Sequence, residues 1–166
     1  MFTINSILIY RSRICKVSDI SEQTFGNVTK KYYILSPLYD DKNTIYVPLD
    51  NPELTSKMKQ VLTEEEAFAL IEYGKENSME WIADNKERPI KFKNILENGN
   101  REEIILVLKV LKEHRKSLEA LGKYLHSSDE ILLQRAEKAI YNELAFVLGI
   151  ELNEINEFLK TKNAKF

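Results

Sequence analysis

One cysteine, five glycines and four prolines occur in the 166 residues of this chain. A single cysteine, Cys15, excludes an intramolecular disulfide and a zinc site built from cysteines alone, and it is expected to fill a small core position in a reduced protein. Five glycines assemble neither a dinucleotide-binding fingerprint nor a phosphate-binding loop. The sequence therefore excludes most nucleotide-dependent enzymes.

Long hydrophobic runs are also missing. No stretch approaches the ~20 apolar residues that span a bilayer, and the first ten residues lack a charged leader followed by an apolar core. We therefore expect a cytoplasmic protein without membrane contact. Hydrophobic residues still make up 43% of the chain, which is enough to bury a core.

An excess of positive charge is absent as well. Lys and Arg number 24 against 26 Asp and Glu, which gives a formal net charge of -2. Proteins that bind nucleic acid by charge alone carry a strong basic excess, so the sequence excludes that class. If this chain contacts DNA, another molecule has to bring it there.

Residues that could perform catalysis or bind a metal are few. His114 and His126 have no metal-ligand spacing and are expected as solvated residues on helix surfaces. A small hydrolase or transferase that uses acids such as Glu80 or Asp84 is a weaker alternative, because no Ser, His or Cys set accompanies them. We expect no catalytic activity, no cofactor and no metal.

The first 52 residues have the pattern of a small β-sheet or barrel. Short runs of β-branched and aromatic residues predict strands over 6–10, 14–22, 30–38 and 44–48. Gly26 and Asn27 tolerate positive φ and predict a hairpin turn. Pro48 closes the last run and cannot donate a ladder hydrogen bond, so this strand is predicted at a sheet edge, where another chain can add.

From residue 63 onward, apolar residues follow the helical period. Capping and first-turn signals predict where five helices begin, and a last short helix is expected over 155–159. The residues that carry these signals are Thr63, Ser78, Pro89, Asn100 and Ser127. Together the two patterns predict an α+β protein with two domains, namely a β domain over 1–52, a linker over 53–62 and an all-α bundle of about five helices over 63–166.

Trp81, the only tryptophan, lies in a polar stretch that basic residues follow, namely Lys86, Arg88, Lys91 and Lys93. An aromatic ring flanked by cations suits partial insertion beside a base step, with contacts to phosphates. The same residues equally suit a tryptophan that packs a short segment onto the bundle, with solvated lysines around it. The predicted edge strand with Tyr46 can likewise be an ordinary strand of the barrel, with no partner.

Several segments resemble the CarD/CdnL family of bacterial transcription regulators, whose polymerase-interacting domain is shared with the transcription-repair coupling factor. In the first half the resemblance rests on residues 1–5 leading to Tyr10, and on 14–20, 31–35 and 44–51. In the second half it rests on the Trp81 segment followed by Arg88, on 96–100, and on 136–141 before 143–145. Many relatives have a glycine in the first hairpin, where this chain has Arg11-Ser12-Arg13.

The resemblance implies a Tudor- or SH3-like β-barrel whose edge strand pairs with a strand of the RNA polymerase β subunit. The residues it assigns to that contact are Thr44, Ile45, Tyr46, Val47 and Pro48. It also implies that Trp81 enters the minor groove at the upstream edge of melted promoter DNA, while Lys86, Arg88, Lys91 and Lys93 contact phosphates. Delivery by the polymerase makes a weak DNA affinity sufficient, because the tether supplies a high effective concentration.

The sequence leaves one alternative open among binding proteins. A non-catalytic adaptor could hold another protein by strand addition and use the helical bundle as a second protein-binding module, with no direct role at DNA. A monomer is expected in either case, although an exposed edge strand can also pair with its own copy.

Overall fold

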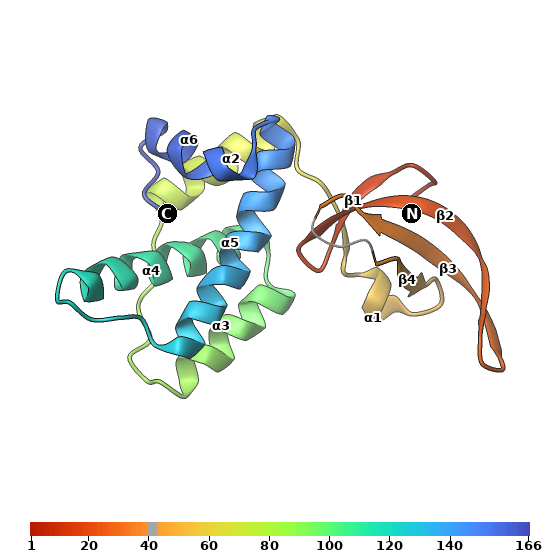
Figure 1. The fold of residues 1–166 in the computed structure, drawn as a ribbon, viewed down its shortest axis with the longest axis horizontal. Coiled ribbons are helices and arrows are strands. Elements are labelled where there is room, and N and C mark those ends of the chain that lie inside the picture. The colour runs from red at the N-terminus through yellow and green to blue at the C-terminus, as the bar shows by residue number, and fades with distance from the viewer. Residues whose placement is uncertain (40–42) are drawn as a thin grey trace. The chain divides into compact units, whose positions relative to one another are not determined.

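The computed structural model describes residues 1–39 and 43–166. The protein is α+β, with an antiparallel sheet followed by helices (Figure 1). Its residues form two compact units, Met1–Val61 and Leu62–Phe166. We call these the strand unit and the helical unit.

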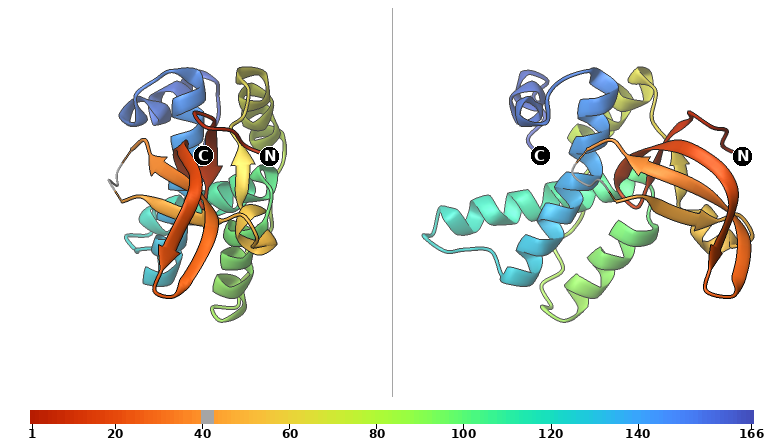
Figure 2. Two further views of the ribbon diagram at one scale, coloured as in Figure 1. Left: turned by 90° about the vertical axis from the view of Figure 1, so that its right-hand side faces the viewer. Right: turned by 45° about the vertical axis from the view of Figure 1, so that its right-hand side comes forward.

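The strand unit contains five strands, and the four predicted ones are confirmed. They are β1 Ile7–Tyr10, β2 Arg13–Phe25, β3 Val28–Pro37, β4 Ile45–Pro48 and β5 Met58–Gln60, in the sheet order β4-β3-β2-β1-β5. Gly26, with a φ of 62°, lies in the predicted turn of the long, curved β2–β3 hairpin (Figure 2). Among the described strands β4 pairs only with β3 and β5 only with β1, so the sheet is open, and the expected closure into a barrel is not seen.

One face of this sheet forms the core of the strand unit. Period-2 alternation brings apolar side chains of all five strands together there, among them Leu8, Cys15, Leu35 and Val47. Burial raises the pKa of the Cys15 thiol to about 11, so this cysteine stays protonated at neutral pH. Its role as a core residue is the one that the sequence predicted.

The segment 53–62, expected as a linker, contains regular structure. Asn51 accepts a hydrogen bond from Leu54 N and caps the short helix α1, Pro52–Thr55. Strand β5 then pairs antiparallel with β1, and Met58 is buried in the strand core. A three-residue strand is too short to show a period in the sequence, which is why it was not predicted.

The helical unit contains five helices of seven or more residues. They are α2 Glu64–Glu76, α3 Glu87–Asn98, α4 Arg101–Glu119, α5 Ser127–Leu148 and α6 Ile155–Thr161, the last preceded by the 3₁₀ turn η1 Leu152–Glu154. The capping boxes predicted at Thr63 and Asn100 are both present. None of the helices that the structure describes could span a membrane.

One predicted helix start is wrong. No helix begins at Ser78, because the backbone is already extended at Asn77. Side chains rather than helical amides donate to the carbonyls of this segment. Lys109 Nζ, for example, donates to Asn77 O at 2.6 Å. The start predicted at Ser127 is confirmed, and the residue that caps α5 is His126. Its Nδ1 accepts a hydrogen bond from Ser128 N at 3.4 Å.

Candidate functional site

Strand β4 forms one edge of the open sheet, and its register fixes which backbone groups face outward. Leu49 N donates to Lys31 O at 2.9 Å, and Val47 lies opposite Tyr33. Because hydrogen-bonded and non-hydrogen-bonded pairs alternate in an antiparallel ladder, Ile45, Val47 and Leu49 bond to β3. The main-chain groups of Tyr46 point away from β3, toward the side where a further strand would add.

The five residues predicted for partner binding divide between core and surface. Val47 is fully buried and Ile45 packs against the same core, so both hold β4 in place. The side chain of Tyr46 is 41% exposed on the opposite face, Thr44 is exposed, and Pro48 ends the strand. A partner at this edge could therefore contact the side chains of Thr44, Tyr46 and Pro48. The side chains of Ile45 and Val47 belong to the core.

An aromatic cluster that the sequence did not predict lies beside this edge. Phe25, Tyr32 and Tyr46 have ring centroids 5.2–6.2 Å apart and interplanar angles of 77–87°. Phe25 is 51% exposed although it contacts both tyrosines. Its position at the end of β2 gave no signal of this contact, since the curvature of the hairpin brings it there.

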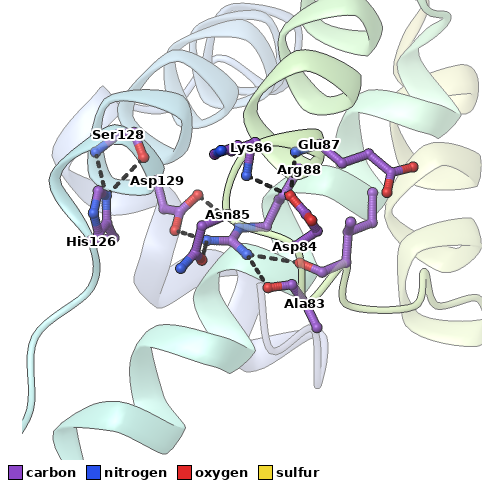
Figure 3. Close-up of polar contacts among 10 residues, drawn as sticks. Ala83, Asp84, Asn85, Lys86, Glu87, Arg88, His126, Ser128 and Asp129 are labelled. Atoms are coloured by element: carbon purple, nitrogen blue, oxygen red, sulfur yellow. Dashed lines mark hydrogen bonds and ion pairs between the residues drawn. The ribbon is translucent and has the colours of Figure 1, made fainter.

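In the helical unit, Arg88 is the centre of a buried polar network (Figure 3). Its Nε and Nη2 donate to the two carboxylate oxygens of Asp129 at 2.9 and 2.7 Å. It also donates to Ile82 O at 2.7 Å, to Asn85 Oδ1 at 2.8 Å and to Ala83 O at 3.4 Å. Arg88 is 3% exposed and Asp129 is 1% exposed, so the pair ties the first turn of α3 to the first turn of α5.

This network corrects the prediction that Arg88 contacts a phosphate. The guanidinium has no face toward solvent, and opening the pair to reach DNA would leave the Asp129 carboxylate buried without its partner, which costs several kcal/mol, about 3–5. Arg88 is therefore a structural residue. The sequence could not reveal this, because Asp129 lies 41 positions further along the chain.

Trp81 is half-buried against the helical core. Its ring stacks on the imidazole of His114, with centroids 3.7 Å apart and an interplanar angle of 20°, and the Arg88 guanidinium lies 4.2 Å from its centroid. Phe92, in the core, meets it edge-on at 6.3 Å. In this structure Trp81 therefore packs onto the bundle, and His114 is its stacking partner rather than the solvated residue that the sequence predicted.

The three lysines predicted to contact phosphates are exposed. Lys86 immediately precedes α3, Lys93 lies two turns further on, and Lys91 forms a surface ion pair with Glu87 at 2.6 Å. Ile90, 70% exposed, lies among them. Of the four predicted phosphate contacts, the structure leaves these three accessible.

Glu80 and Asp84 are the acids that the sequence offered for catalysis. Asp84 accepts hydrogen bonds from the Lys86 and Glu87 amides, which lower the pKa of its carboxyl and organise the start of α3. Glu80 is exposed. Within 1–39 and 43–166, no group of three His, Cys, Asp or Glu side chains could hold a metal ion.

Comparison with known proteins does not assign a family. The chain matches no protein-family model, and no curated protein has significant similarity to it.

Proposed function

We propose that this protein is a CarD/CdnL-like regulator of bacterial transcription that binds the RNA polymerase β subunit through β4 and stabilises the open promoter complex without catalysis. The strand unit would be a Tudor- or SH3-like domain, and the helical unit a second domain that contacts promoter DNA. Both would act in the cytoplasm, with the protein as a monomer.

The observation that carries the proposal is the orientation of Tyr46 in β4. An edge strand with outward main-chain groups binds an extended partner by backbone hydrogen bonds, and the adjacent side chains supply selectivity. The exposed rings of Tyr46 and Phe25 offer apolar surface beside that edge. A strand of the polymerase is the partner that the resemblance of this segment to CarD-like proteins implies.

On the helical unit, the proposed DNA contacts are Lys86, Lys91 and Lys93, with Trp81 as the residue that enters the minor groove. Contacts made only in the open complex stabilise it by their differential free energy, and about 1.4 kcal/mol changes its lifetime tenfold. Stabilisation helps promoters that are limited by melting and slows those limited by promoter escape.

The test is the lifetime of open complexes formed by cognate polymerase on a ribosomal-type promoter. We expect the wild-type protein to lengthen it, and Tyr46→Pro to abolish the effect together with polymerase binding. Proline removes an outward-facing amide, so the β3–β4 ladder is retained. Trp81→Ala should retain polymerase binding and lose the lifetime effect.

Two controls make the result specific. Tyr46→Phe keeps the amide and the ring, and it should bind polymerase like the wild type. Val47→Pro removes an amide that bonds to β3, and it should unfold the sheet edge, which circular dichroism and thermal melting would report. Tyr46→Pro that binds polymerase normally would refute the edge-strand contact.

The adaptor remains the second candidate, and the docking of Trp81 is the observation that favours it. A tryptophan packed on His114 and Phe92 is not presented to DNA in this state. An adaptor predicts binding through β4 with no change in open-complex lifetime at any promoter.

A further inference from the structure

The irregular segment between α2 and α3 holds the chain's single tryptophan in a docked position. Its attachments come from three helices, namely His114 of α4 by stacking, Arg88 of α3 by hydrogen bonds to Ile82 O and Asn85, and Asp129 of α5 through Arg88. The ion pair of Arg88 and Asp129 is buried. The contact between Trp81 and His114 is the one that lies nearer the surface.

We propose that His114 is the positioning residue that keeps Trp81 docked on the helical unit, and that Trp81 leaves this stack in order to reach DNA. The second part rests on the proposed function, whereas the first does not. Docking thus sets the fraction of molecules in which Trp81 can enter the minor groove, because only the undocked fraction is competent to bind DNA.

The charged groups that face His114 give the docking a pH dependence. Partial burial and the nearby Arg88 guanidinium lower the pKa of the imidazole, while Asp129 opposes them and is neutralised by Arg88. When Trp81 leaves, the imidazole returns toward the ordinary pKa of about 6.5. The undocked state then binds more protons as the pH falls through this value, so acidification favours undocking.

Fluorescence of Trp81 tests the docking directly, since no other tryptophan contributes. The measurement is the acrylamide quenching rate constant from fluorescence lifetimes of the full chain, between pH 8 and pH 5.5. We expect it to rise at least about twofold in the wild type as the pH falls. His114→Ala should raise it at every pH, because the stacking partner is gone.

Two variants separate this role from a merely structural one. His114→Phe keeps a ring that can stack and removes the titration, so quenching should stay low and flat with pH. His126→Ala removes the other histidine, which caps α5, and it should retain the wild-type pH profile. Equal quenching in wild type and His114→Ala, with both folded by circular dichroism, would overturn the docking role.

The open-complex assay tests the second part. His114→Ala should lengthen the open-complex lifetime beyond the wild-type effect by about threefold or more, whereas His114→Phe, which keeps the stack, should give the wild-type lifetime near pH 8. A wild-type protein without effect on lifetime would refute the proposed function and with it the release onto DNA, while the quenching result still decides the docking. A lifetime effect that His114→Ala leaves unchanged would overturn only the release.

Discussion

Gly74, in α2, occupies a position where the helical core leaves no room for a side chain. A Cβ built there would lie 2.9 Å from the ring of Phe166 and 3.0 Å from Ile105 Cδ1. Alanine would gain about 1 kcal/mol of helix propensity, but overpacking costs about 1–3 kcal/mol. We expect Gly74→Ala to lower the free energy of unfolding by about 1 kcal/mol in urea denaturation.

The same position allows a double-mutant test. Phe166→Leu replaces the ring that the new methyl group would meet with a shorter side chain. Gly74→Ala in that background should therefore stabilise the protein relative to Phe166→Leu alone. If Gly74→Ala stabilises the wild-type protein equally, the Phe166 contact is not what limits the space.

The burial of single residues was predictable from the sequence in some cases and not in others. The exposure of Lys86, Lys91 and Lys93 was predictable, since lysine side chains are almost never fully buried. The burial of Arg88 was not, because its bidentate partner Asp129 is distant in sequence and no local pattern marks the pair. His114 was assigned to the surface for the same reason, as its partner Trp81 lies in another segment.

At the scale of elements, the first hairpin is the least favourable piece of the strand unit. Tyr10 pairs with Arg13, and the two loop residues between them, Arg11 and Ser12, have φ values of 48° and 67°. Positive φ at both positions is the pattern of a type I′ turn, which favours Asn-Gly. A non-glycine residue there costs about 1 kcal/mol.

We therefore expect the double substitution Arg11→Asn and Ser12→Gly to stabilise the protein by about 1–2 kcal/mol, measured as a higher denaturation midpoint with an unchanged slope. Asn27→Gly is the matched control. It lies in the β2–β3 turn without positive φ, so glycine adds only unfolded-state entropy and should not stabilise. A gain from Asn27→Gly as large as that of the double substitution would contradict the turn assignment.

Long elements were predictable and short connections were not. Strands β1 to β4 and the helices α2 to α6 repeat their period over enough residues, or carry a cap or first-turn signal, to identify them. Strand β5 and the segment after Asn77 are defined by tertiary partners, namely β1 for the first and the Arg88 and Lys109 side chains for the second. Such partners leave no local trace in the sequence.

For the whole molecule, the net charge of -2 limits how DNA can be bound. Three exposed lysines that contact phosphates would give a logarithmic salt dependence of about -3, far weaker than that of autonomous DNA-binding proteins. Free chain should therefore bind promoter DNA only weakly, and the polymerase tether has to supply the missing affinity. Salt dependence then distinguishes phosphate contacts from a general effect of charge.

The variant with Lys86→Gln, Lys91→Gln and Lys93→Gln should bind polymerase normally and lose most of the lifetime effect. The exposed Lys91–Glu87 pair contributes little to stability, so α3 is retained. Across a KCl series, the ratio of lifetimes with and without the protein should fall steeply for the wild type, and its slope should flatten by about two to three in the variant.

A second triple variant, Lys123→Gln, Lys160→Gln and Lys165→Gln, removes the same charge from other exposed positions and should behave like the wild type. Equal losses in both triple variants would mean that net charge, and not the three lysines at α3, controls the effect, because only local phosphate contacts depend on which lysines are removed.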